Sequence, residues 1–384
     1  MKVNFAFEQG PIRPPSEAKS LLIRATRNCP WNKCAFCHTY RGSKFGMRSV
    51  KEIKDDIQRA KDISDRIREM SQENGEGGEV TEFILSMIFN NDNHFDDSFR
   101  SIAAWLYFGG ESVFIQDANS IIMKTDDLVE VLSFIRDKFP CVKRITSYCR
   151  SNTASRKSVE DFKRLHKAGL SRIHIGMETG YDPLLTFIRK GVTASEHIEG
   201  GKKIRASGIS LSEYVIPGLG GEKWTKEHAE ETAKVLNQIN PQFIRFRTLQ
   251  VRRDTELYEM MKRGEFKPIG DEDILREIKI FIESLDGIES TIVSDHILNL
   301  LEELEGTLPE DKGKLIAIID RYFSLSEKER AVFRLGRRRG LYRKLDDLSD
   351  ARMYDKLQSI VEQYWAKDQT QLDRDLCGIM HNYI

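Results

Sequence analysis

Short apolar runs alternate with longer amphipathic stretches along the first 270 residues of the chain. The runs are nearly continuous in aliphatic and β-branched side chains, which is typical of strands covered on both faces. They lie at 21–26, 112–118, 144–150, 172–178, 212–218 and 242–251. The pattern therefore predicts six strands of a buried parallel sheet.

Helical stretches connect these runs and end as helices commonly do. Residues 159–169 place Phe162 and Leu165 on one face and end at a glycine. The stretch 194–208 also ends at a glycine, and 225–240 ends directly before a proline. The repeated order of strand, helix, glycine and strand is typical of βαβ units. The sequence predicts an α/β protein whose six strands form a partial (β/α)6 TIM-like barrel.

Two regions depart from this alternation. Residues 50–110 predict a helical insertion, in which the apolar run 83–89 is too short for its periodicity to separate helix from strand. After residue 270 the strand pattern ends, and helices are predicted at 272–285, 296–306, 313–325 and 351–365. We therefore expect a barrel domain over 1–270, with an insertion at about 50–110, and a C-terminal helical domain over 271–384.

Charge and hydropathy limit the kinds of partner. The 384 residues include 60 basic and 60 acidic side chains, and this zero balance argues against a protein that coats nucleic acid or an anionic membrane. No apolar run approaches the roughly 20 residues of a membrane span, and the first residues lack the apolar core of a signal peptide. We expect a cytoplasmic chain without membrane contact, in which clustered cysteines indicate metal binding or catalysis.

Three of the six cysteines fall within nine residues, directly after the first predicted strand. They are Cys29, Cys34 and Cys37, on a loop at the end of the barrel where active sites of such barrels lie. A zinc site would need a fourth ligand, for which His38 is adjacent. Soft thiolates on a loop suit an iron–sulfur cluster better. Three cysteines on a four-iron cluster would leave one iron open for a substrate or cofactor.

This segment resembles the cluster loop of radical S-adenosylmethionine (SAM) enzymes, which carry three cysteines after the first strand of a partial barrel. Phe36, directly before the third cysteine, is also typical. The usual spacing has three residues between the first two cysteines, whereas Cys29 and Cys34 enclose four. The resemblance covers 21–266 and is closest to the branch with oxygen-independent coproporphyrinogen oxidases, Elongator-type enzymes and methylthiotransferases. The matching segments are 44–53, 167–180, 190–193, 216–222, 254–257 and 263–266.

The resemblance implies a 4Fe–4S cluster on Cys29, Cys34 and Cys37, with SAM chelating the fourth iron. Reductive cleavage of SAM would give a 5′-deoxyadenosyl radical that abstracts hydrogen, in an oxidoreductase or transferase reaction. The neutral charge favours a small organic molecule as substrate over nucleic acid, with flavodoxin or ferredoxin as the electron donor. The alternatives are modification of tRNA or protein, and a non-catalytic iron–sulfur or zinc sensing module.

Four residues are candidates for contact with SAM, among them Phe36 of the cysteine segment. Asp117, where family members usually carry a Gly-Gly-Glu-type turn, would accept from the SAM amino group or form an Asx turn. Glu178 would bind a ribose hydroxyl or form an ion pair at the barrel rim, and its place at a strand end favours the first. Arg150 would meet the SAM carboxylate with its planar fork or lie at the surface.

Two basic features bear on the substrate. Arg245 and Arg247 alternate on the sixth predicted strand and so face one side, toward a carboxylate-bearing substrate or toward ordinary ion-pair partners. Residues 334–344 hold the densest basic run, which would contact RNA or an anionic substrate, or form a solvated helix end. Buried free thiols without a ligand role are expected of the remaining cysteines, Cys141, Cys149 and Cys377.

Overall fold

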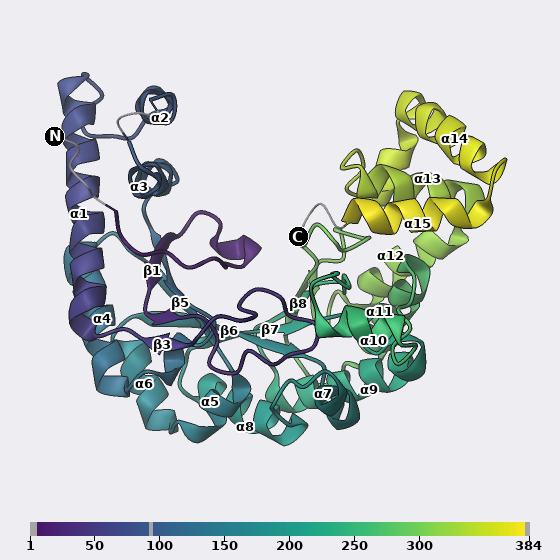
Figure 1. Ribbon diagram of the computed structural model, residues 1–384, viewed down its shortest axis with the longest axis horizontal. Coiled ribbons are helices and arrows are strands. Elements are labelled where there is room, and N and C mark those ends of the chain that lie inside the picture. Colours follow the sequence, from purple (N-terminus) through teal and green to yellow (C-terminus); the bar gives the residue numbers. More distant parts are fainter. Residues whose placement is uncertain (1–5, 92–94, 381–384) are drawn as a thin grey trace. The chain divides into compact units, whose positions relative to one another are not determined.

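The computed structural model describes residues 6–91 and 95–380, which form two compact units (Figure 1). The first unit consists of the segments up to 32, 39–175 and 199–211, and the second of 33–38, 176–198 and the chain from 212 onward. The division predicted at residue 270, where the strand pattern of the sequence ends, stays a prediction. The segment with the three cysteines contributes residues to both units.

A parallel sheet in the order β1-β4-β5-β6 forms the core of the first unit. Its strands are β1 (Leu21–Arg24), β4 (Ser112–Gln116), β5 (Arg144–Cys149) and β6 (Leu170–Glu178), the last of which passes into the second unit after Ile175. Leu21 pairs with Val113, and Ser112 pairs with Arg144. The side chains of Leu21 and Val113 are fully buried, as the nearly continuous apolar runs predict.

Helices cover this sheet and fill the predicted insertion. α1 begins with a capping box between Ser49 and Glu52 and buries a stripe that includes Ile53, Ile57 and Ile67. The apolar run 83–89 is helical, the first of its two alternatives. The helices are α1 (Val50–Glu73), α2 (Glu82–Phe89), α3 (Asp97–Tyr107), α4 (Thr125–Lys138), α5 (Ser151–Arg156) and α6 (Val159–Lys167), with the 3-10 turns η1 (Pro15–Glu17) and η2 (Ser120–Ile122).

A short antiparallel ribbon closes the segment that carries the three cysteines. β2 (Thr26–Arg27) pairs with β3 (Gly46–Met47), so the chain leaves and returns at one place. We call residues 28–45, between these strands, the cysteine loop. The ribbon was not predicted, because strands of two residues leave no readable alternation.

The second unit has its own group of strands. β7 (Ser210–Val215, in this unit from Ser212), β8 (Phe243–Phe246) and β9 (Thr291–Val293) are parallel, and β10 (Gly306–Thr307) is antiparallel to β9. β9 and β10 lie beyond residue 270, where only helices were predicted. The six predicted strands are all present, and the alternation of strand and helix confirms an α/β fold of the partial-barrel type.

Helices make up most of the rest of the second unit. α9 packs against α11, and α13 packs against α14 and α15 (Figure 1). Residues 296–305 form turns and irregular structure and Gly306 begins β10, so the helix predicted at 296–306 is wrong. The helices are α7 (Asp182–Phe187), α8 (Ala194–Ala206, in the first unit from Glu199), α9 (Gly221–Ile239), α10 (Glu256–Lys262), α11 (Asp271–Ser284), α12 (Lys312–Ser324), α13 (Glu327–Arg338), α14 (Ala351–Trp365) and α15 (Gln369–Met380), with the 3-10 turn η3 (Leu345–Ser349).

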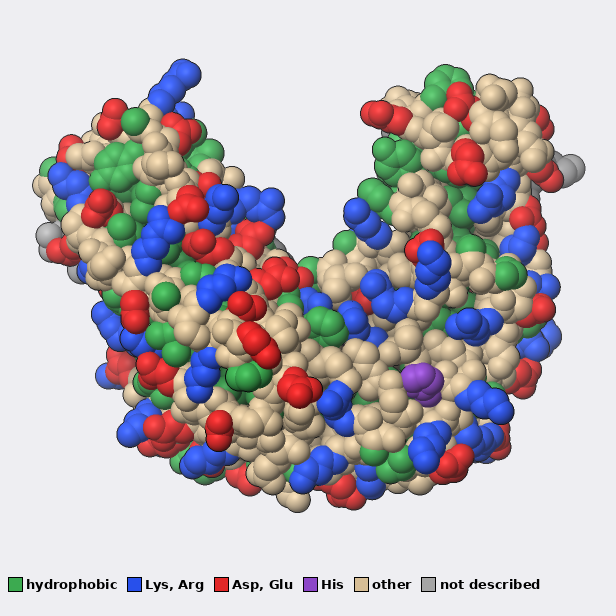
Figure 2. Space-filling model, turned by 180° about the vertical axis from the view of Figure 1, so that it is seen from behind, with side chains coloured by type: hydrophobic (Ala, Val, Ile, Leu, Met, Phe, Trp, Pro, Cys, Tyr) green, Lys and Arg blue, Asp and Glu red, His purple; other side chains and the backbone are tan. Residues whose placement is uncertain are grey.

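Charges of both signs share the molecular surface. Figure 2 shows Lys and Arg side chains intermingled with Asp and Glu side chains on the face it draws, as equal numbers of each sign would lead one to expect. Among the helices of the described residues, none has both the length and the apolar character that a membrane crossing requires.

Candidate functional site

None of the three clustered cysteines forms a disulfide. Cys29, Cys34 and Cys37 are each partly exposed. Within residues 6–91 and 95–380, no three His, Cys, Asp or Glu side chains are arranged to hold a single metal ion. The donor set, three soft thiols on one loop, fits an iron–sulfur cluster in its chemistry.

Two asparagines in the left-handed backbone region flank the first cysteine. Asn28 has a φ of 67° and Asn32 a φ of 48°, and asparagine tolerates this region better than most residues. The Asn32 N–H points to Sγ of Cys29 at 3.5 Å, and its side-chain amide donates to the carbonyls of Tyr40 and Ser43. These contacts turn the chain between the first two cysteines, where the loop has one residue more than the usual spacing.

The part of the cysteine loop in the second unit is held through a buried alanine. The Ala35 N–H donates to the Ile188 carbonyl at 2.8 Å, and its own carbonyl accepts from the Leu257 N–H at 2.8 Å. Phe36 packs, partly buried, against the apolar cluster that contains these three residues. The neighbours of Cys34 and Cys37 are thus tied to two other segments of the unit, while a contact of Phe36 with SAM stays a prediction.

Arg150 lies beside the cysteine loop within the first unit. It is buried at the start of α5, and its backbone N–H donates to the side-chain oxygen of Asn119 at 3.0 Å. Its guanidinium is 5.6 Å from the centre of the Trp31 ring, a cation–π distance. The planar guanidinium of Arg150 is therefore held against Trp31, which is two residues after Cys29 in the sequence. Its contact with the SAM carboxylate stays a prediction.

Asp117 is completely buried and is bound by protein groups at both carboxylate oxygens. Oδ2 accepts from Nε and Nη2 of Arg24, at 3.1 and 2.7 Å, and from the Asn28 N–H at 3.1 Å. Oδ1 accepts from the hydroxyl of Tyr40. Burial and the neighbouring carboxylate raise the pKa of Tyr40, so its hydroxyl stays protonated and donates. The sequence signalled Asp117 but not its partners.

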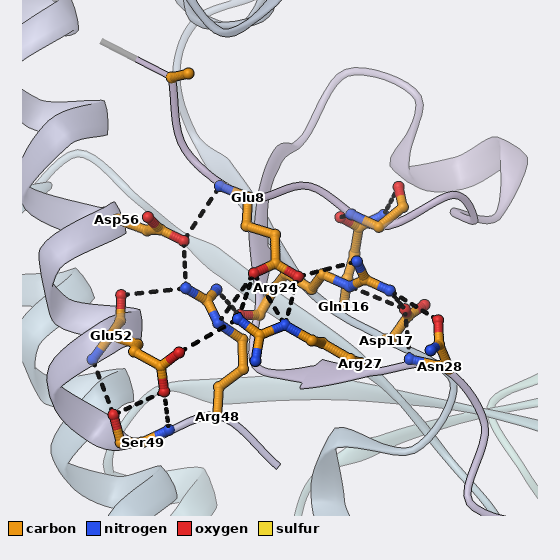
Figure 3. Close-up of polar contacts among 12 residues, drawn as sticks. Glu8, Arg24, Arg27, Asn28, Arg48, Ser49, Glu52, Asp56, Gln116 and Asp117 are labelled. Atoms are coloured by element: carbon orange, nitrogen blue, oxygen red, sulfur yellow. Dashed lines mark hydrogen bonds and ion pairs between the residues drawn. The ribbon is translucent and has the colours of Figure 1, made fainter. Parts of the chain in front are cut away.

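A wider network of ion pairs continues from this carboxylate (Figure 3). Glu8 pairs with Nη1 of Arg24 at 3.0 Å and with Nη2 of Arg27 at 2.6 Å. The hydrogen bond from Arg27, with the charges of nearby arginines, lowers the pKa of Glu8. Arg48 pairs with Asp56 of α1 at 2.7 Å and donates to the Arg24 carbonyl at 2.6 Å. The network joins the N-terminal segment, both strands before the loop and α1.

Two glutamates and a lysine meet at the end of β6. Glu178, with a left-handed φ of 67°, pairs with Nζ of Lys190 at 2.7 Å, which is the ion pair foreseen as its alternative role. Ribose binding by Glu178 stays a prediction. Glu213 of β7 is completely buried, and neither carboxyl oxygen has a hydrogen-bond partner among the described residues. Burial and the Glu178 charge raise the pKa of Glu213, so it is held neutral. Its signal in the sequence was a glutamate inside an apolar run.

Glu277 of α11 holds the glycine-rich turn that follows β7. Its Oε1 accepts from the Gly218 N–H at 2.6 Å. Close by, His228 lies between the Thr179 hydroxyl (2.8 Å) and the Ile216 carbonyl (3.0 Å), with Nε2 3.6 Å from Oε1 of Glu277. Burial raises the pKa of Glu277 to about 8 and lowers the pKa of His228 to about 4. Both side chains are therefore neutral at pH 7.

Replacing Glu277 by Gln is expected to change how stability depends on pH. Between its ordinary pKa of 4.5 and the folded value of about 8, the folded chain keeps a proton that the unfolded chain releases. Wild-type stability therefore falls as pH rises through this window, by up to about 1.4 kcal/mol per pH unit from this group. Because glutamine stays neutral, the free energy of unfolding of Glu277→Gln should increase relative to that of the wild type from about pH 5 to about pH 8. Urea unfolding at several pH values measures this difference.

The matched control is Glu283→Gln, an exposed glutamate on the same helix. Its stability difference from the wild type should not vary over this pH range. If the two variants follow the wild type in parallel, Glu277 does not carry the proton.

The two arginines near β8 differ in exposure. Arg245 is buried and pairs with Asp295 at 2.8 Å, which confirms the ion-pair alternative for this residue. Arg247, directly after β8, is exposed, and its backbone N–H donates to the Val215 carbonyl at 3.0 Å, so that the shared face of the two side chains stays a prediction. Asp254 lies on the segment that follows β8, and its Oδ2 is 3.9 Å from Nδ1 of His38.

The basic run 334–344 is the solvated helix end expected as one alternative only in part, since Arg339, Arg343 and Lys344 are exposed whereas two other arginines are buried. Arg338 is buried, pairs with Asp271 at 2.5 Å and donates to the Leu298 carbonyl at 2.7 Å. Arg337 is also buried and lies 3.3 Å from Glu302. These arginines stabilise the second unit from within and are not accessible to RNA.

The remaining cysteines differ from one another. Cys149 is buried, as predicted. Cys141 is exposed at the start of the segment before β5, so burial was the wrong expectation there. The Cys377 side chain lies outside the described residues.

Comparison with known proteins places this site in context. The family model for the radical SAM superfamily matches residues 23–236. The tRNA uridine(34) acetyltransferase of Methanocaldococcus jannaschii is 24% identical over 289 residues, which are 70% of this chain and 49% of that protein. That of Methanocaldococcus infernus is 28% identical over 144 residues, 36% of this chain and 24% of that protein. The chain thus spans about half the length, or less, of these relatives.

Solved structures of similar chains include two with different coverage. Elp3 of Methanocaldococcus infernus, lacking its N-terminus, has 18% identity and a TM-score of 0.40, over 56% of this chain and 53% of that chain. Methylornithine synthase has 12% identity and a TM-score of 0.40, over 79% of this chain and 82% of that chain.

These comparisons correct the expected partners. Both relatives are named for tRNA, so the expectation of a small-molecule substrate, with nucleic acid argued against, is wrong. The zero net charge was the basis of that expectation. Net charge averages over the whole surface, however, and contacts to phosphates depend on a few local cations.

Proposed function

Since the chain belongs to the radical SAM superfamily, we propose that it is an enzyme that modifies tRNA, using SAM and a 4Fe–4S cluster. Membership in this superfamily makes it an enzyme, whereas the reaction is our proposal. The likeness to two tRNA uridine(34) acetyltransferases, one over 70% of the chain, is the observation that carries it.

Cys29, Cys34 and Cys37 would hold the cluster, since they are partly exposed, form no disulfide and lie on one loop. When bound, the cluster supplies the electron that cleaves SAM to methionine and a 5′-deoxyadenosyl radical. Arg150 would bind the SAM carboxylate with its buried guanidinium, and Glu178, which pairs with Lys190, would accept from the ribose.

The proposed reaction can be tested with the reconstituted chain. Under anaerobic conditions, SAM and dithionite are added with tRNA, and the digested nucleosides are analysed by mass spectrometry. We expect 5′-deoxyadenosine together with a tRNA nucleoside of changed mass. The proposal would be contradicted if SAM were cleaved at the same rate with and without tRNA and every nucleoside kept its mass.

Arg247 is well placed in the second unit to bind a tRNA phosphate. It is exposed just after β8, at the strand end where barrel enzymes act, and its side chain has no partner in residues 6–91 and 95–380. Burial lowers the pKa values of His38 and His296, and the Arg247 charge lowers both further. An unpaired guanidinium therefore lies near His38, the residue that follows Cys37.

Arg247→Glu is expected to weaken tRNA binding about tenfold near physiological salt, because a phosphate contact becomes a repulsion. The slope of log affinity against log salt should fall by about one. Both quantities can be measured by fluorescence anisotropy with labelled tRNA over a salt series.

Arg343→Glu is the matched control, since Arg343 is an exposed arginine of the basic run 334–344. It carries the same change of charge on a surface that we do not expect to contact tRNA. Binding that is weakened by Arg343→Glu and not by Arg247→Glu would place the tRNA on the basic run instead.

A further inference from the structure

The geometry points to Asp117 as a positioning residue that holds the cysteine loop on both sides of its cysteines, so that the three cysteines retain the cluster. This inference rests on the proposed function, because it concerns the group that the cysteines would hold. It gives Asp117 a role toward the loop in addition to, or in place of, the predicted contact with the SAM amino group.

The carboxylate of Asp117 contacts the loop before and after its cysteines. Its Oδ2 accepts from the Asn28 N–H, one residue before Cys29, and its Oδ1 accepts from the hydroxyl of Tyr40, three residues after Cys37. All three groups belong to the first unit. One side chain, directly after β4, is therefore bonded to the loop on both sides of its cysteines.

Further bonds close the loop around this carboxylate. The Asn28 side chain donates to the Lys44 carbonyl at 2.7 Å and accepts from Nη2 of Arg24 at 3.1 Å. The Tyr40 carbonyl accepts from the Asn32 side chain, which joins the segment after the cysteines to the turn between Cys29 and Cys34. With the ribbon of β2 and β3, these contacts define where the loop starts and where it ends.

The site requires a charged acceptor. Asp117 is completely buried, and Arg24 supplies two charge-assisted hydrogen bonds that balance its charge (Figure 3). A Cβ on Gly10 would lie 3.2 Å from the carboxylate, so the N-terminal segment covers it closely. Gln116 holds that segment by exchanging hydrogen bonds with the Gly10 backbone at 2.8 and 3.0 Å. Water has little room to replace the protein donors.

Asn at position 117 would keep the shape but lose the charge. An amide has one oxygen and one NH2 group, so either Arg24 and Asn28 would face a donor, or the Tyr40 hydroxyl would have to accept instead of donate. In both orientations the negative charge that Arg24 contacts is lost. Groups that orient metal ligands from outside typically change metal affinity 10–100-fold when removed. We expect Asp117→Asn to lose iron to a chelator about tenfold faster than the wild type.

The experiment follows iron release from anaerobically reconstituted protein by the loss of cluster absorbance in excess chelator. Asp56→Asn is the matched control, because Asp56 is a buried carboxylate of the same network, paired with Arg48, without a bond to the cysteine loop. Asp56→Asn should lower the melting temperature but release iron at the wild-type rate. Equal iron release by the wild type and Asp117→Asn would overturn the inference.

Tyr40→Phe keeps the test decisive if Asp117→Asn does not fold. It removes one hydrogen bond to the carboxylate and leaves the ion pair with Arg24 intact. It should also release iron faster than the wild type, and unchanged release would count against the inference. A variant at 117 that retains iron normally but no longer binds SAM would favour the direct contact with SAM. Failure of the wild type to bind any cluster would instead defeat the proposed function.

Discussion

Replacing Cys29, Cys34 and Cys37 together by alanine is expected to abolish SAM cleavage, to below the detection limit for 5′-deoxyadenosine. The reason is that no other thiol lies near these three in sequence to replace them as ligands. Iron bound after anaerobic reconstitution should fall from about four per chain to background. Iron analysis and the absorbance of the cluster measure the loss independently of activity.

Cys141, which is exposed and not in a disulfide, provides the control for this experiment. Cys141→Ala removes an accessible thiol outside the cysteine loop and should leave both iron content and SAM cleavage unchanged. A triple variant that still cleaves SAM would show that the cysteine loop is not the site of the reaction.

Arg338→Ala is expected to lower the free energy of unfolding by about 3–5 kcal/mol, the usual cost of leaving one partner of a buried ion pair unpaired. The substitution would strand the Asp271 carboxylate, which begins α11, and would remove the donor to the Leu298 carbonyl. Urea unfolding at neutral pH measures the change.

The neighbouring Arg339 is exposed and supplies the comparison. Arg339→Ala should change stability by no more than about 0.5 kcal/mol, as is usual for surface positions. Similar losses from the two variants would mean that the ion pair with Asp271 contributes little and that α13 itself is sensitive to alanine.

The strands of the barrel were predictable because each is long enough for a buried parallel strand to appear as an apolar run. All six appear close to their predicted positions. β9, with only Thr291–Val293, is too short to give such a signal. Its pairing with β8 is a contact between segments about 50 residues apart, which local patterns do not contain.

The helix predicted at 296–306 failed for a physical reason. Its leucines are buried, as the helical pattern requires, but the backbone carbonyls of Leu298 and Asn299 accept from the guanidinium groups of Arg338 and Arg337. Those donors come from about 40 residues away. Tertiary hydrogen bonds thus replace the bonds that a local helix would have made.

The candidate site, like the fold, could be predicted only where its residues lie close together in the sequence. The cysteines are adjacent in sequence, so their clustering could be recognised directly. The partners of Asp117 could not, because Arg24 lies 93 residues and Tyr40 77 residues away from it. The role of Glu277 was equally hidden, since it acts on Gly218 from a helix beyond the segment that resembles the family.

The two short strands after α11 also have a consequence for how molecules of this chain meet one another. A parallel sheet that stopped at β8 would present a row of unpaired N–H and C=O groups, which is a template for pairing with a second chain. β9 pairs with that row of groups, and β10, which has only two residues, pairs with β9 in the antiparallel direction. The sheet therefore ends on a strand too short to recruit another molecule, and the chain is protected against edge-to-edge aggregation on this side.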